Sequence, residues 1–185
     1  MPGLLLTALA IAVVIKTFLI QPFWIPSESM VPTIEVNDRV MVNKLTVRFG
    51  QPNRGDIIVF RDPAAPDIEE SIPELFLRTV LEAVGVRVRG HDDLIKRVIG
   101  LPGETLSIED NRVHIDGVPL AEPYLPNGVT MPSLEPVTIG RDEVFVMGDN
   151  RRSSFDSRNF GTIPMEDVIG KAFIVIWPFS HFGGL

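Results

Sequence analysis

The amino-acid sequence predicts a mainly β protein, because its apolar residues fall in short β-branched stretches separated by Gly, Pro, Asn and Asp. The pair Asp116-Gly117, directly after Val113-His114-Ile115, is typical of a two-residue hairpin turn and indicates antiparallel strands. Two segments depart from this pattern: an apolar run at the N-terminus and a stretch of helical periodicity near residue 75. We expect strands at 38–43, 56–60, 94–99, 105–108, 113–115, 143–147 and 172–177.

The N-terminal run, residues 4–20, is apolar apart from Lys16 and predicts one membrane-spanning helix. As a helix it would be roughly 26 Å long, close to the lower limit for crossing a bilayer. A cleaved signal peptide would need a basic arm before the core and a small-residue site after it, and both features are missing. A buried helix of a soluble core is the other alternative. Because Pro22 and Pro26 prevent the helix from continuing, we expect a transmembrane anchor over 1–21 and a β domain over 22–185.

Composition excludes several classes of function. The 185 residues carry a net charge of −7, which argues against nucleic-acid binding through phosphate contacts. The absence of cysteine excludes thiol proteases, disulfide scaffolds and Cys-ligated zinc. The three histidines, His91, His114 and His181, are isolated in the sequence and have no metal-ligand spacing. We therefore expect no metal and no other cofactor.

Three further segments interrupt the strands. Residues 63–92 form an expected insertion: a loop rich in Pro, Ala and acidic residues, followed by an amphipathic helix over 72–84. That helix would either cover the β core or lie on a membrane surface. Residues 105–141 are expected to form a small β lobe, within which 122–136 resembles a linker and holds four prolines. The aromatic cluster at 177–182 would be core or a second membrane contact.

Ser29 is a candidate nucleophile that lies between Pro26 and Pro32. The two prolines hold this segment extended or turned, which would fix a side chain just outside the membrane. A serine between prolines is, however, more often a turn residue or a helix cap. Ser29 therefore needs a partner before it can be assigned to catalysis.

Lys96 is the candidate partner. In a strand over 94–99 it would share a face with Leu94 and Val98, where a charged amine is costly unless it is paired or neutral. Desolvation lowers the pKa of an ammonium, and a neutral amine near Ser29 could take its proton. The alternative is a lysine whose side chain reaches solvent at the surface. A polar loop at 148–161, GDNRRSSFDSRNFG, would either support such a site or be an ordinary loop with an Asp–Arg pair.

Four segments occur in order after the apolar run, and together they resemble the type I signal peptidase family. They read SESMVPT at 27–33, RGDIIVF at 54–60, KRVIGLPG at 96–103 and GDNRRSSFDSRNFG at 148–161. The family pattern is S-x-S-M-x-P-T, R-G-D-[IV]-[IV]-V-F, K-R-[VA]-[IV]-G-L-P-G and G-D-N-R-x-x-S-x-D-S-R-x-x-G. The resemblance covers nearly the whole chain except 63–92 and 119–141. The amino-acid sequence at 15–27 and 37–45 is similar to that of actinobacterial members.

The resemblance implies a signal-peptidase-like antiparallel β domain and a Ser–Lys dyad. It assigns the nucleophile to Ser29 and the general base to Lys96, and it places Ser27 in the oxyanion hole together with the Ser29 backbone N–H. Glu28, between the two serines, departs from the small or polar residue that is common there.

The same resemblance assigns supporting roles in the polar loop. Ser154 matches the serine that orients the lysine, because 156–158 fixes the register. Asp156 and Arg158 would form a supporting ion pair, and Asp149 and Arg151 would be structural.

The family removes signal peptides from exported preproteins after small residues at the first and third positions before the cut. Phe23, Ile25, Met30 and Ile95 match the residues that line the corresponding shallow pockets. The substrate would add as a strand beside 23–26 and 93–95. The implied partners are signal peptides and the lipid bilayer, with no nucleic acid, and we expect a monomer. The implied location is the cytoplasmic membrane, with a single span and the catalytic domain on the extracytoplasmic face.

Three alternatives remain open from the residues themselves. SOS-repressor self-cleaving proteases share the dyad type but carry a DNA-binding domain and no anchor. A pilus or conjugation maturation peptidase is closer and is excluded less firmly. The third alternative is an anchored β domain that binds partners and has lost its dyad chemistry.

Overall fold

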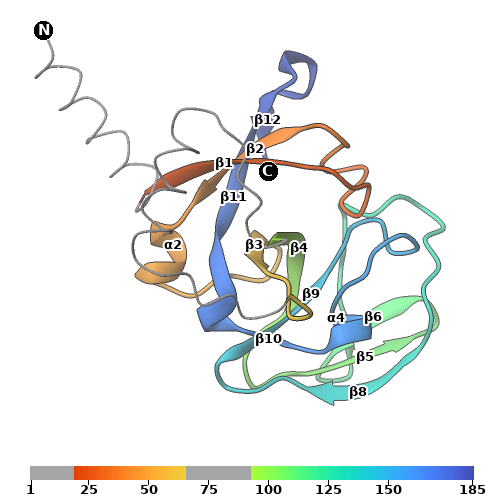
Figure 1. Ribbon diagram of the computed structural model, residues 1–185. Helices are drawn as coiled ribbons and strands as arrows, with labels where there is room; N and C mark the ends of the chain where they lie inside the picture. The colour runs from red at the N-terminus through yellow and green to blue at the C-terminus, as the bar shows by residue number, and fades with distance from the viewer. Residues whose placement is uncertain (1–18, 66–92) are drawn as a thin grey trace, which may run out of the picture.

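The computed structural model describes residues 19–65 and 93–185 (Figure 1). Most of the expected anchor and the expected amphipathic helix at 72–84 lie outside the described residues. Within the described ranges, no helix has the length and apolar character needed to cross a membrane.

A large antiparallel sheet forms most of the described structure and has the order β1-β2-β11-β3-β4-β9-β10, with β12 paired to β11. Figure 1 shows β11 running through the centre of the molecule. The strands are β1 (Ile20–Trp24), β2 (Arg39–Asn43), β3 (Ile57–Arg61), β4 (Asp93–Gly100), β9 (Glu143–Met147), β10 (Ile163–Pro164), β11 (Val168–Trp177) and β12 (Gly183–Gly184).

A second sheet has four strands in the order β7-β6-β5-β8 and lies at the end of the molecule away from β1 and β2 (Figure 1). Its strands are β5 (Thr105–Glu109), β6 (Arg112–Ile115), β7 (Val118–Pro119) and β8 (Leu134–Thr138). Two-residue turns at 110–111 and 116–117 join β5, β6 and β7. All four turn residues have positive φ, as this tight hairpin geometry requires.

The apolar side chains of the strands build three buried clusters. One joins residues 25–34 around the candidate nucleophile Ser29 (the nucleophile segment) to β1, β2 and β11. A second joins the small sheet to β9. The third lies between β3, β4, β9 and β10. Residues 57–60 of β3 are buried on both faces, which explains the continuous apolar sequence IIVF in place of an alternating one.

All seven expected strands are present, with ends that shift by a few residues, and the mainly antiparallel β class is confirmed. The strands β1, β7, β8, β10 and β12 are additional. The expected anchor extends to residue 21, whereas Ile20 and Gln21 belong to β1 and pair with Asn43 and Val42. Pro22 is compatible with this strand because β1 is at the edge of the sheet, where one side of the backbone needs no partner.

The described helices are short. They are the α-helices α2 (Leu45–Arg48) and α4 (Ser157–Phe160) and the 3-10 turns η1 (Met165–Asp167) and η2 (Phe179–His181). Helix α4 has the strongest start signal, because the Asp156 side chain accepts from the Arg158 N–H and Asn159 completes a capping box. This cap fixes the end of the polar loop that follows β9.

Candidate active site

Ser29 lies in a loop that leaves β1 and returns to β2. The loop is closed at its base, where the Ile25 N–H donates to Asp38 O at 2.9 Å and the Asn37 N–H donates to Ile25 O at 2.8 Å. The side chain of Met30 is fully buried in the first cluster and holds the loop on the sheet. Ser29 itself is only 5% exposed, so its hydroxyl lies in a largely dry environment.

Lys96, in the middle of β4, reaches the Ser29 hydroxyl. Its Nζ lies 2.8 Å from Ser29 Oγ and 2.9 Å from the backbone oxygen of Ile95. As the alternation predicts, Leu94 and Val98 pack in one cluster and Ile95 packs in another. The amine is buried and has no carboxylate within hydrogen-bonding distance among the described residues.

Burial lowers the pKa of Lys96 from 10.5 to about 8, although the negative charges of Asp156 and Asp62 oppose this shift. An amine with a pKa of about 8 is neutral in about a tenth of the molecules at pH 7 and in about half of them at pH 8. Such an amine can accept a proton from the hydroxyl that it contacts.

Ser27 lies beside Ser29 on the exposed side of the loop, with its Oγ 3.4 Å from Ser29 Oγ. The Ser29 N–H donates to no acceptor among the residues that the structure describes. A hydroxyl and a free amide N–H therefore flank the position where an oxyanion would form. Two donors of this kind are the usual composition of an oxyanion hole.

The polar loop after β9 contains the expected Asp156–Arg158 pair, with Arg158 Nη2 2.8 Å from Asp156 Oδ2. Asp156 also accepts from the Gly148 N–H at 3.0 Å. Burial alone would raise the pKa of Asp156, but these donors hold it below its usual range. A permanently charged carboxylate is thus fixed near Lys96, and its field stabilises the ammonium form.

Ser154 has a buried hydroxyl that makes no hydrogen bond with Lys96, but it helps to lower the pKa of Asp156. It is nevertheless close to the nucleophile segment. A methyl group on Gly148 would lie 2.2 Å from Ser154 Oγ and 2.4 Å from Ser29 O, so only glycine fits between them. The orientation of Lys96 by Ser154 stays a prediction.

The four expected pocket residues lie together. Ile25, Met30 and Ile95 are buried in the first cluster, and Phe23 is partly buried against the same cluster. The structure therefore places them around one apolar region beside Ser29.

Comparison with known proteins identifies the family of the chain. A model of the signal peptidase, peptidase S26 family matches residues 3–177. A signal peptidase I of Leptolyngbya laminosa is 39% identical over 180 residues, which are 96% of this chain and 79% of that protein. The chain belongs to the signal peptidase I family.

Two further members of the family are also similar to this chain. A signal peptidase I of Mycobacterium tuberculosis H37Rv is 37% identical in an alignment of 209 positions, gaps included, that covers 95% of this chain and 71% of that protein. A crystal structure of a signal peptidase I from Enterococcus faecalis V583 is 28% identical, with a TM-score of 0.46 over 65% of this chain and 95% of that chain. The removal of signal peptides is accordingly the activity of the family to which this peptidase belongs.

Three residues connect the Lys96 and Ser29 segments; the sequence suggested a structural role for Asp149 but none for Arg97 or Thr33. Arg97, next to Lys96, makes a double contact with Asp149 at 2.8 and 2.6 Å. Asp149 also accepts from the Thr33 hydroxyl, four residues after Ser29. This buried network ties β4, the polar loop and the nucleophile segment together. All three residues lie inside the motifs, which was the available signal.

Two more links were missed. The Asn150 N–H donates to Ser29 O at 3.0 Å, so the loop also holds the nucleophile by its own backbone. His181, which looks isolated in the sequence, has its Nδ1 2.8 Å from Asp38 Oδ1, and this contact raises the pKa of the histidine. It fastens the C-terminal turn to the base of the nucleophile loop. No cluster able to hold a metal is found among residues 19–65 and 93–185.

Proposed function

We propose that this chain is a membrane-bound serine endopeptidase that removes signal peptides from exported preproteins after Ala-x-Ala. Ser29 is the nucleophile and neutral Lys96 is the general base. The observation that carries the proposal is the 2.8 Å contact between Lys96 Nζ and Ser29 Oγ in a buried setting that lowers the pKa of the lysine.

In the first step, Lys96 accepts the hydroxyl proton while Ser29 Oγ attacks the carbonyl carbon of the scissile peptide bond. The Ser29 N–H and Ser27 Oγ stabilise the developing oxyanion. The carbon–nitrogen bond then breaks, and the Lys96 ammonium returns its proton to the leaving amine. The product is an ester of the signal peptide on Ser29 and the free N-terminus of the mature protein.

In the second step, a water molecule attacks the ester and neutral Lys96 accepts a proton from it. The carbon–oxygen bond to Ser29 breaks, the serine regains its proton from the lysine, and the signal peptide leaves as a carboxylic acid. The Arg97–Asp149–Thr33 network supports both steps by holding Lys96 and Ser29 in register.

The substrate backbone adds beside β4. Strand β3 covers one edge of β4 along its length from Asp93 to Arg97. Strand β9 covers the other edge only from Arg97 onward, so no described strand pairs with Leu94 and Ile95 on that side. An extended peptide there would end at Lys96 and place its small side chains against the apolar region around Ile25 and Met30.

The remaining parts of the proposal concern the setting. The apolar run ahead of β1 is the single membrane anchor, and the β domain lies on the extracytoplasmic face as a monomer. Since Ser29 follows Ile20 by nine residues, it stays within about 30 Å of the end of that run. A signal peptide presents its cleavage site at a similar height.

The test is cleavage of a preprotein with an Ala-x-Ala site by the full chain purified in detergent. S29A and K96A are each expected to lower the rate by more than about a thousandfold. The matched controls are S180A, at an exposed serine, and K171A, at a lysine that pairs with Asp56, and both should cleave normally. Cleavage retained by both dyad variants would refute the mechanism.

A further inference from the structure

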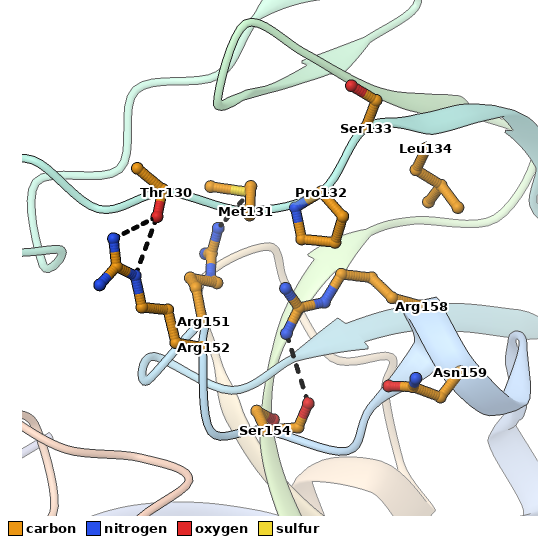
Figure 2. Close-up of a pocket in the computed structure, with 10 residues that line it drawn as sticks. All are labelled: Thr130, Met131, Pro132, Ser133, Leu134, Arg151, Arg152, Ser154, Arg158 and Asn159. Carbon is orange, nitrogen blue, oxygen red and sulfur yellow. Dashed lines mark hydrogen bonds between the residues drawn. The ribbon is translucent and has the colours of Figure 1, made fainter.

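A cavity of about 530 Å³ lies beside the polar loop and is not lined by Ser29 or Lys96. One wall is the segment 130–134, which leads into β8. The other wall consists of Arg151, Arg152, Ser154, Arg158 and Asn159. Figure 2 shows the three arginines reaching from the loop and α4 toward the 130–134 segment.

The cavity is positively charged in a chain whose net charge is −7. No acidic residue lines it. Arg151 forms an ion pair with Glu122, and Arg158 forms one with Asp156; neither carboxylate lines the cavity. The third arginine, Arg152, has no carboxylate partner among the residues that the structure describes.

The exposed Arg152 guanidinium is held in place by a neutral group. Its Nε and Nη2 both donate to the Thr130 hydroxyl, with the Nε contact at 2.8 Å (Figure 2). Its Nη1 donates to no described acceptor. An oriented guanidinium with unused donors is suited to bind a carboxylate.

The cavity is next to the reacting groups. Arg151 and Arg152 directly follow Asn150, whose N–H holds Ser29 O. Ser154 lines the cavity, and its buried Oγ is separated from Ser29 O only by the space at Gly148, where a methyl group would not fit. Two residues of chain span at most about 7.6 Å, so the Cα of Arg152 lies within about 7.6 Å of the Cα of Asn150, which is hydrogen-bonded to Ser29.

The open edge of β4 and the proposed position of the scissile bond at Lys96 together give the path of the substrate. A peptide beside Leu94 and Ile95 must leave the sheet at Lys96, because β9 occupies that edge of β4 from Arg97 onward. The part of the substrate beyond the scissile bond therefore turns over the loop that follows β9. That loop carries Arg151 and Arg152.

We propose that this cavity, with Arg152 at its rim, is a subsite for acidic side chains in the first residues of the mature protein, just after the cleavage site. This inference rests on the proposed signal-peptide cleavage. It adds a preference for Asp or Glu on the mature side, which would act on substrate affinity because the guanidinium touches neither Ser29 nor Lys96.

The experiment uses three peptides with the same Ala-x-Ala signal-peptide portion and Glu, Gln or Lys at the second to fourth mature positions. For the full chain, kcat/KM should fall from Glu to Gln to Lys by about threefold per step, mainly through KM. R152E should reverse the Glu-to-Lys ratio, and R152K should preserve it. R112E, at an exposed arginine of the small sheet that does not line the cavity, should keep the original ratio.

Equal kcat/KM for the three peptides, or the same ratio in R152E as in the unmodified chain, would overturn the subsite and leave the cleavage mechanism intact. A change of ratio in R112E equal to that in R152E would also overturn it, because the effect would then come from overall charge. Failure to cleave any of the peptides would overturn both proposals. The melting temperature of R152E, compared with that of R152K, checks that the variants are folded.

Discussion

Lys96 and Arg97 are neighbours on β4 and both are buried, but only Arg97 has a carboxylate partner within hydrogen-bonding distance among the described residues. Lys96 contacts a hydroxyl and a backbone carbonyl, and its pKa falls to about 8. Arg97 contacts both oxygens of Asp149, the Gly55 carbonyl and the face of Tyr124, whose ring centre lies 4.0 Å away. Because a guanidinium does not lose its proton in proteins, burying it requires a counter-charge.

The difference shows how a reactive residue can be built beside a structural one. The amine can respond to desolvation by releasing its proton, and that release is the step which the proposed mechanism requires. The guanidinium cannot, so it serves as a fixed connector between β4, Asp149 and the nucleophile segment. Burial therefore lowers the pKa of the amine at Lys96, whereas at Arg97 it requires an ion pair with Asp149.

The largest expected effect comes from exchanging the two cation types. K96R places a group that stays protonated where a base is needed, and we expect peptide cleavage to fall by more than about a thousandfold. R97K keeps a positive charge near Asp149 but loses the double contact, and we expect a loss of about tenfold. The measurement is kcat/KM on one Ala-x-Ala peptide at pH 8. Comparable activity in K96R and the unmodified chain would contradict the role of Lys96.

The second effect is on stability, where the neighbours should differ in sign. R97M leaves the buried Asp149 carboxylate without its counter-charge and should lower the free energy of unfolding by about 3–5 kcal/mol. K96M removes an ammonium that is costly to bury and should raise the free energy of unfolding at pH 7 by up to about 3 kcal/mol. Urea titrations of both variants test this pair of expectations.

The K96M gain has a pH dependence of defined sign. The pKa of Lys96 is lower in the folded chain than in the unfolded chain, so the unfolded state binds more protons between pH 8 and 10.5. The stability contributed by Lys96 therefore rises with pH across that window, and the advantage of K96M should shrink over it. A difference between the two proteins that stays constant from pH 7 to 10 would show that Lys96 is not desolvated.

The comparison also shows what the sequence could reveal. Ser29 and Lys96 could be proposed as partners because their motifs are local, and the strand alternation around Lys96 indicated its burial. The Arg97–Asp149 and Thr33–Asp149 contacts join residues 52 and 116 positions apart, and only the folded sheet determines which polar residues meet. Strand β1 was missed for a related reason: its sequence, IQPFW, forms a strand because β2 provides a partner for its backbone.

The smallest effect concerns the field around Lys96. Cleavage should rise with pH as Lys96 loses its proton, with a midpoint near pH 8 for kcat/KM. Asp156 and Asp62 both raise the pKa of Lys96, and Asp156 has the larger influence. Asp156 also holds Arg158 and Gly148, so D62N is the cleaner test of charge alone.

D62N keeps an oxygen that can accept from the Ala64 N–H, as Asp62 does. Removing the negative charge lowers the pKa of Lys96, so the pH–rate midpoint should move to lower pH while the plateau stays the same. At pH 7 the rate should then increase by less than about threefold, because an interaction across a solvated distance is weak. A midpoint that does not move in D62N or in D156N would mean that a group other than Lys96 controls the rate. The low pKa of Lys96 would then not account for the pH dependence of cleavage, and the functional difference proposed between Lys96 and Arg97 would be wrong.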